Sequence, residues 1–324
     1  MSRDEPFQIL IIDGNGGGEF LEIDNLEDVI ESHDHLIWVH LNYSQTAAKD
    51  WVMSASWLDT VIKKNLLDDD SRPRCITYQN GLFLSLRGVN LNPGSDPEDM
   101  VAVRLWATER CIISSNRRRL ISLEDIKESL LNKTGPYSAA GFITRLIDQL
   151  AFRAEVVIEQ LEDTFEQVED DLSTIKNKEQ RAQISDLRRQ AIRLKRYFAP
   201  QKEALTHLLN DSPSWLAKSD KIHVRESINK FNRYLEELDS IRDRAIVAQE
   251  ELLGKLSELL NQRMYVLTLV ATLFLPLGFL TGLLGINVGG IPGAENQYGF
   301  IISSMAIILI AICMILFLKF KKWF

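Results

Sequence analysis

The stretch MYVLTLVATLFLPLGFLTGLLGI, residues 264–286, contains no charged residue and decides what kind of fold the chain can adopt. The charge-free run continues to residue 294, and after Glu295 a second one covers 296–318. As helices, 264–286 and 300–318 would be roughly 35 and 28 Å long, which matches a hydrocarbon core of about 30 Å. A soluble domain rarely carries two such runs in succession. The sequence therefore predicts two membrane spans, with a buried hairpin as the alternative.

Basic residues flank this pair of spans on one side only. Lys255 and Arg263 precede the first span, and the tail 319–324 carries three lysines, whereas the loop 287–299 has neither Lys nor Arg. By the positive-inside rule, both termini are expected in the cytoplasm and the loop outside. We expect a two-span protein of the cell inner membrane, in contact with the lipid bilayer.

A long helix is expected to lead into the first span. Apolar residues recur every seven positions, and a second row fills the intervening positions. No proline interrupts the pattern before Pro276, so the simplest interpretation is one helix from about Lys221 to Gly285, roughly 95 Å long. Its part outside the membrane, 216–263, would be a stalk. The first row is Val224, Phe231, Leu238, Ala245, Leu252 and Leu259; the second is Ile228, Leu235, Ile241, Ala248 and Leu256.

The region 1–215 is expected to be a mixed α/β domain. Turn residues separate short runs rich in β-branched and aromatic residues, and Asn80-Gly81 is a strong hairpin signal. Residues 44–66 are typical of a helix, Ser122 with Asp125 resembles a capping box, and 138–174 and 179–210 are long amphipathic helices. The expected strands are Phe7–Ile12, Glu19–Ile23, Leu36–Leu41, Cys75–Tyr78, Leu82–Val89, Val101–Ala107 and Cys111–Ser114.

Composition excludes several functions. The net charge is −8; residues 264–324 carry one Glu and three Lys, so the rest of the chain sums to −10. That balance argues against binding of nucleic acid and favours cations as partners. The three cysteines form no CxxC pair and give no disulfide framework. The sequence contains no nucleophile–base set, so we expect neither an enzyme nor a cofactor.

The end of the first span carries the clearest motif. Thr281-Gly-Leu-Leu-Gly-Ile-Asn-Val-Gly-Gly-Ile-Pro-Gly293 resembles the signature of the CorA metal-ion transporter family, and more closely its ZntB zinc-transporter branch. The stretches Trp38–Tyr43, Ser71–Arg74 and Arg196–Gln201 are also similar to that branch. The similarity covers nearly the whole chain.

The resemblance implies a homopentamer. Each subunit would contribute an α/β/α cytoplasmic domain, a long stalk helix and two spans, and five first spans would line a pore for divalent cations, zinc foremost. Asn287 would form a ring at the outer mouth. From spacing alone, Asn287 is equally well a helix cap. The other residues assigned to the pathway are Met264, Ala271, Leu275, Gly278, Gly285 and Ile286.

Acidic residues could attract the cation at both ends of this pathway. Glu295 is the single charge of the outer loop, and five copies would concentrate cations by electrostatic focusing. Glu236, Asp243 and Glu250 are spaced by seven, away from the apolar stripe, and the same row continues to Met264, Ala271 and Gly278. A plain solvated surface is the alternative in each case. No convincing Cys/His cage for zinc is present.

Three functions remain open at this stage. The leading one is a zinc-type divalent-cation transporter, with direction and proton coupling undecided. A magnesium, cobalt or nickel channel of the same family is the second. A membrane-anchored sensor or scaffold, whose α/β domain binds a partner, is the third and belongs to a different class.

Overall fold

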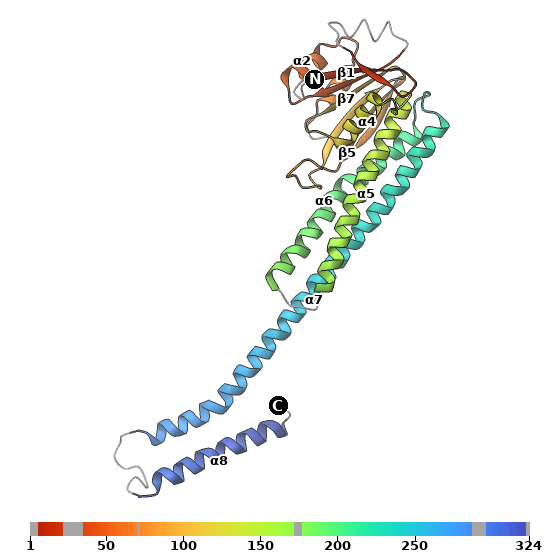
Figure 1. Ribbon diagram of the computed structural model, residues 1–324. Coiled ribbons are helices and arrows are strands. Elements are labelled where there is room, and N and C mark those ends of the chain that lie inside the picture. The colour runs from red at the N-terminus through yellow and green to blue at the C-terminus, as the bar shows by residue number, and fades with distance from the viewer. Residues whose placement is uncertain (1–5, 22–34, 70–71, 172–176, 287–295, 322–324) are drawn as a thin grey trace. The chain divides into compact units, whose positions relative to one another are not determined.

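A computed structural model describes residues 6–21, 35–69, 72–171, 177–286 and 296–321. The chain divides into two compact units, Met1–Gln249 and Glu250–Phe324. Figure 1 shows the helices and strands that make up the units.

The N-terminal unit is built on a seven-stranded sheet in the order β2-β1-β3-β7-β6-β5-β4. Neighbouring strands are antiparallel except β3 and β7, which run parallel. The seven expected runs form these strands, although residues 22 and 23 of the second run lie outside the described part. The strands are β1 Phe7–Ile12, β2 Gly18–Phe20, β3 Leu36–Asn42, β4 Arg74–Tyr78, β5 Gly81–Gly88, β6 Val101–Ala107 and β7 Cys111–Asn116.

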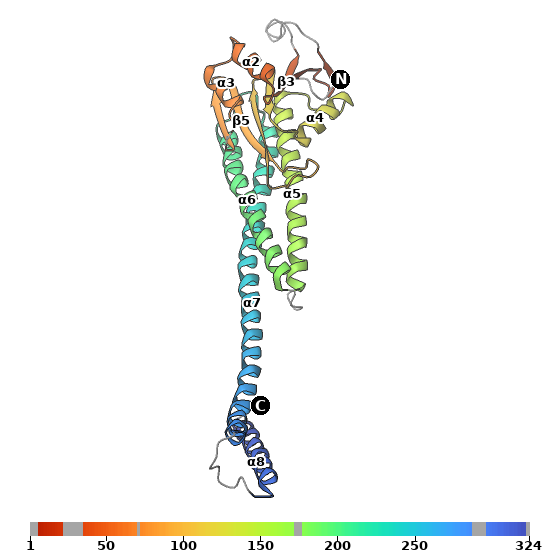
Figure 2. The same ribbon diagram turned by 90° about the vertical axis from the view of Figure 1, so that its left-hand side faces the viewer.

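Helices cover both faces of the sheet, which confirms the α/β/α architecture. On one face, α2 (Thr46–Ser54) and α3 (Thr60–Leu66) bury apolar side chains against β1, β3, β5 and β7. On the other face, Trp38 of β3 packs edge-on against Phe142 of α5 (Ala139–Asp171), with ring centroids 4.8 Å apart. Figure 2 shows α2 and α3 on the side of the sheet away from α4 (Ile121–Leu131) and α5.

The single helix expected over 44–66 is two helices. The break lies between Ser54 and Thr60, where Asp59 is the N-cap of α3 and its carboxylate accepts a hydrogen bond of 2.7 Å from the Val61 amide. An aspartate at this position satisfies an amide that has no partner within the helix. The periodicity of the two helices is similar enough that the pattern alone did not reveal the break.

The hairpin predicted from Asn80-Gly81 is present, but its turn lies one residue earlier. Tyr78 pairs with Gly81, so Gln79 and Asn80 form the turn, and Gln79 has a positive φ of 54°. Gly81 is already in β5, where a Cβ would come within 2.3 Å of the Trp106 ring. The glycine is therefore required by close packing and not by the turn.

The capping box predicted from Ser122 and Asp125 is wrong. Helix α4 has Leu120 as its N-cap with no side-chain hydrogen bond, and Ser122 lies buried inside the helix. The Asp125 carboxylate instead pairs with Arg153 of α5. Asp125, which the local pattern assigned to the capping box, therefore forms an ion pair with another helix.

Three long helices complete the N-terminal unit: α5, α6 (Asn177–Asn210) and the first part of α7 (Lys218–Leu284). The first apolar row of α7 is buried from Val224 to Leu252, as expected, whereas Leu259 is only partly buried. The second buried row is Ser227, Tyr234, Ile241 and Ala248, so the assignment of Ile228 and Leu235 to it was wrong. Counting back from Ile241 in steps of seven gives Tyr234 and then Ser227. Because both side chains carry a hydroxyl group, a pattern of apolar residues alone does not identify this row.

The C-terminal unit contains the rest of α7 and the helix α8 (Gly299–Phe320). Both are long and apolar enough to cross a membrane, with mean hydropathies of 2.1 and 3.0 over their most apolar 18 residues. Almost none of either stretch is buried within the chain. The long helix expected from about Lys221 to Gly285 is confirmed as α7.

Candidate functional site

The less exposed residues of the two apolar helices mark the faces that they turn toward each other. On α7 they are Leu269, Thr272, Leu273, Leu277 and Leu280, and on α8 they are Gly299, Ser303, Ser304, Ile307, Ala311, Met314 and Leu318. The spacing of three and four is that of a single helical face. Thr272 and Met314 also line one apolar hollow of about 860 Å³. We infer that these rows form the contact between the two helices.

The residues that the sequence assigned to the pathway lie on another face of α7. Ala271, Leu275 and Gly278 each precede a residue of the α8-facing row by two positions. At about 100° per residue, this places them about 200° around the helix, almost opposite α8. Leu275 is 71% exposed, and a Cβ added at Gly278 would meet nothing within 4 Å. Met264 is also exposed.

The three threonines of this stretch are satisfied within the helix. Thr268 and Thr272 donate hydrogen bonds of 2.8 Å to the carbonyl oxygens of Met264 and Thr268, and Thr281 donates one of 3.1 Å to that of Gly278. Such bonds remove the cost of a hydroxyl in an apolar surrounding. The three hydroxyl groups therefore already have hydrogen-bond acceptors within α7.

The helix ends where the motif begins. The Gly285 amide donates to the carbonyl oxygens of Thr281 and Gly282, after which Ile286 leaves the helix. Asn287 and Glu295 lie outside the described residues, so both assignments stay predictions.

The acidic row of α7 is exposed at all three positions, Glu236, Asp243 and Glu250. Asp243 is held by its neighbour Arg242, at 2.8 Å. Within the described part of the chain, Glu250 has no ion-pair or hydrogen-bond partner, whereas the adjacent Glu251 pairs with Lys255 at 2.7 Å. Of the pair, Glu250 is the carboxylate free to interact with a cation.

Part of the acidic surface of α5 is neutralised by arginines of α7. Arg233 pairs with Glu155, and Arg244 pairs with Glu169 and, at 3.7 Å, with Glu162. The pKa of Arg244 is raised, chiefly by its hydrogen bond to Glu169. Opposite charges on neighbouring long helices are a signal of such pairs, but the sequence alone does not show that α5 and α7 are neighbours.

No ready-made cage for a soft metal ion exists in the described residues. No group of three or more His, Cys, Asp or Glu side chains is placed to hold an ion there. Burial raises the pKa of the Cys75 and Cys111 thiols to about 12, so neither is available as a thiolate near neutral pH. Burial also lowers the pKa of His40 to about 4.

The fold and these helices define a two-span membrane protein with a large α/β/α unit before the spans. The profile of the family described as "CorA-like Mg²⁺ transporter protein" matches residues 33–322. The chain belongs to the CorA family.

Several known proteins resemble the chain over almost its full length. The "Zinc transport protein ZntB" of Yersinia enterocolitica is 31% identical over 312 residues, which are 96% of this chain and 94% of that protein. The structure described as "the full-length CmaX protein" has a TM-score of 0.85 and 33% identity, and covers 100% of this chain and 99% of that one. The CorA magnesium transporter of Methanocaldococcus jannaschii, at 15% identity with 98% of both chains covered, shares the fold with a TM-score of 0.82.

Proposed function

We propose that this chain is the subunit of an inner-membrane transporter of divalent cations, zinc foremost, with α7 lining the ion pathway. The observation that carries the proposal is the placement of Ala271, Leu275 and Gly278 almost opposite the α8-facing row of α7. In an oligomer with α8 outside, this face would point to a common axis. Two spans cannot enclose a polar path alone, so subunits must combine. A homopentamer is the assembly that we propose.

The chemistry of the pathway suits a largely hydrated ion. Its face carries small and apolar residues without thiolates or imidazoles, so no soft ligand replaces the hydration shell. The amide oxygens of an Asn287 ring would replace part of the outer hydration at the outer mouth. Five Glu295 carboxylates beyond it would concentrate cations, and Glu250 carboxylates would stabilise the ion as it leaves the apolar region.

Zinc is proposed as the substrate because relatives that match 96% of this chain are named zinc transport proteins. Magnesium is the second candidate, because the family description names it and because oxygen ligands alone suit it well. Energetically, a dication entering an inside-negative cell gains roughly 4.6 kcal/mol per 100 mV. Uptake therefore needs no proton gradient, although a gradient can still be used.

Cysteine scanning tests the pathway face. In a Cys313→Ser background, Ala271→Cys and Gly278→Cys should react with a charged, water-soluble thiol reagent in reconstituted protein, and the reaction should block flux. Leu273→Cys and Leu280→Cys, two positions further on, are the matched controls and should stay unmodified. Cys75 and Cys111 should not interfere, since burial keeps their thiols protonated. Equal labelling of both pairs would contradict the proposed pathway.

Ion flux tests the substrate and the class of protein. Proteoliposomes that contain the full chain should take up zinc, measured with and without a pH gradient and against magnesium at equal concentration. Asn287→Ala should remove most of the flux while the oligomer stays intact. The absence of flux for every divalent cation would favour the membrane-anchored sensor or scaffold instead.

Topology and assembly are tested separately. Gln297→Cys should label from outside and Lys322→Cys only from inside, which would place both termini in the cytoplasm. Native mass measurement in mild detergent should give five subunits. A monomer that still transports would overturn the shared pore.

A further inference from the structure

The N-terminal unit contains a polar cavity whose residues are far in sequence from the proposed pathway. It measures about 270 Å³, and every residue that lines it is polar. It lies where the parallel strands β3 and β7 end, since Asn42 and Asn116 are paired as the last residues of the two strands. Ligands in α/β sheets bind characteristically at the carboxyl ends of parallel strands. The lining residues are Gln8, His40, Asn42, Asn116, Arg119, Glu124 and Lys127.

The cavity has an excess of positive charge. The Lys127 ammonium pairs with the Glu124 carboxylate at 2.9 Å and contacts the Gln8 side-chain oxygen at 3.4 Å. The Arg119 guanidinium has no acidic partner within the part of the chain that the structure describes. With one acid and two cations, and with a neutral His40, the lining has a net charge of +1.

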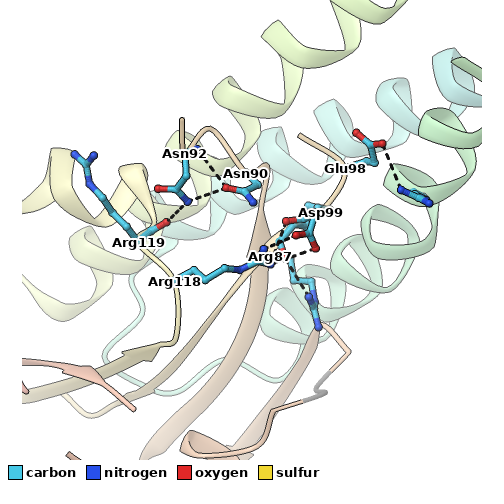
Figure 3. A network of polar contacts seen from close by, with 9 residues as sticks. Arg87, Asn90, Asn92, Glu98, Asp99, Arg118 and Arg119 are labelled. Atoms are coloured by element: carbon cyan, nitrogen blue, oxygen red, sulfur yellow. Dashed lines mark hydrogen bonds and ion pairs between the residues drawn. The ribbon is translucent and has the colours of Figure 1, made fainter. Parts of the chain in front are cut away.

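A neighbouring hollow provides an internal comparison. There Arg118 is bound to Asp99, and Arg117 lies 3.8 Å from Asp69, so carboxylates already offset these two charges. Figure 3 shows the Arg119 side chain turned away from this network, while its backbone oxygen accepts a 3.0 Å hydrogen bond from Asn92. Of these two hollows, the one beside Arg119 retains a cation without an acidic partner among the described residues.

The interior of the cavity offers unused hydrogen-bond donors. Asn116 is 5% exposed, and its side-chain amide has no partner among the described residues. The Asn42 side-chain oxygen accepts from the Ser44 amide and hydroxyl, at 3.1 and 2.7 Å, which leaves its NH₂ group as a donor. Both amides line the cavity, so their N–H groups are open to a ligand that accepts hydrogen bonds.

His40 is held at the wall of the cavity. The Trp38 indole N–H donates a 2.8 Å hydrogen bond to the Ser114 hydroxyl, and that hydroxyl lies 2.8 Å from His40 Nδ1. These contacts fix the position of the imidazole ring.

We propose that this cavity binds a small phosphate-bearing anion, held by the Arg119 guanidinium, the Lys127 ammonium and the amides of Asn42 and Asn116. Phosphate oxygens accept several hydrogen bonds at once, and two of them can accept from the two N–H groups of one arginine side chain. A phosphate group therefore suits this set of donors. Free inorganic phosphate and the phosphate group of a small phosphomonoester share this chemistry. Such a site would make the N-terminal unit a receptor for an anion, independent of whether the chain transports zinc.

Calorimetric titration of the full-length protein in detergent at low salt tests the proposal. Inorganic phosphate should give saturable binding, and Arg119→Gln should weaken it at least tenfold. Arg117→Gln removes the same charge two residues away and should leave the affinity within twofold. A parallel titration with glycerol phosphate distinguishes the two sources, since tighter binding than phosphate assigns a phosphomonoester.

Several results would overturn the site. These are the absence of saturable heat with either probe, an equal loss in both variants, and a loss in Arg117→Gln alone. Asn116→Asp, which places a carboxylate in the cavity, provides a second test and should abolish phosphate binding. Its unfolding midpoint reports whether it is folded, and retained binding in the folded variant would contradict the proposal.

Discussion

The Tyr234 hydroxyl of α7 donates a 3.1 Å hydrogen bond to the carbonyl oxygen of Ala151 in α5. Tyr234 is fully buried and packs edge-on against Phe231, with centroids 5.7 Å apart. This contact fixes how far α7 is rotated and shifted against α5 within the N-terminal unit. Because Arg233 precedes Tyr234 and Glu155 lies one turn after Ala151, the same register brings this ion pair together.

Tyr234→Phe should lower the free energy of unfolding by about 1 kcal/mol, the net value of one hydrogen bond. The Ala151 carbonyl still has its partner within α5, so no large additional cost is expected. Tyr234→Ala should cost about 3–5 kcal/mol, because it also leaves a cavity. Urea denaturation of the three proteins checks the order. Equal loss in the Phe and Ala variants would contradict the assigned packing role.

Gly81→Ala should destabilise the protein by about 1–3 kcal/mol, because the new methyl group would collide with the Trp106 ring. Gly141→Ala is the matched control. There the added Cβ would lie 3.4 Å from the nearest atom, in ordinary contact, and alanine favours the helix by about 0.5–1 kcal/mol. The midpoint of thermal unfolding should fall in Gly81→Ala and rise in Gly141→Ala. A neutral Gly81→Ala would contradict the close packing of Gly81 against Trp106.

His40 should make the N-terminal unit sensitive to mild acid. Burial lowers its pKa from 6.5 in the unfolded chain to about 4 in the folded one. Unfolding therefore takes up a proton between these values, and the free energy of unfolding falls by up to about 1.4 kcal/mol per pH unit as the pH drops from 6.5 towards 4. Above pH 6.5 the effect is absent. His40→Gln should remove this part of the slope in phosphate-free buffer, and an unchanged slope would show that other groups cause it.

Glu250→Gln should reduce zinc flux or weaken zinc affinity several-fold, with a larger effect at low ionic strength. Glu251→Gln is the control, since Glu251 is already paired with Lys255 and lies about 100° further around α7. Flux measured at two salt concentrations checks both variants. The same loss in Glu250→Gln and Glu251→Gln would mean that these acids only keep the helix surface solvated.

Periodicity predicted the regular elements well. The strand Val101–Ala107 was placed at its observed bounds, and the long helix was placed within a few residues. Errors arose where two different structures share one pattern. Two short helices looked like one over 44–66, and Ser122 had the local sequence of a cap but lies inside α4. Local propensity cannot separate these cases, because the deciding contacts come from other elements.

The pathway residues could be proposed from the sequence, but their relation to α8 could not. Spacing places Ala271 and Gly278 on one face of a helix whatever its surroundings. Only the packed helices reveal that Leu273 and Leu280 face α8 and that the proposed row lies on the other side. Asn287 and Glu295 stay predictions of the sequence.

The sequence by itself determined the two apolar helices and the helix leading into them, because hydrophobic length and period depend on neighbours along the chain. Tertiary structure alone decided that Gly81 meets Trp106, that α7 arginines neutralise α5 acids, and that His40, Asn116 and Arg119 share one cavity. His40 and Arg119 are 79 positions apart in the sequence. They meet because β3 and β7 pair in parallel, and no local pattern encodes that pairing.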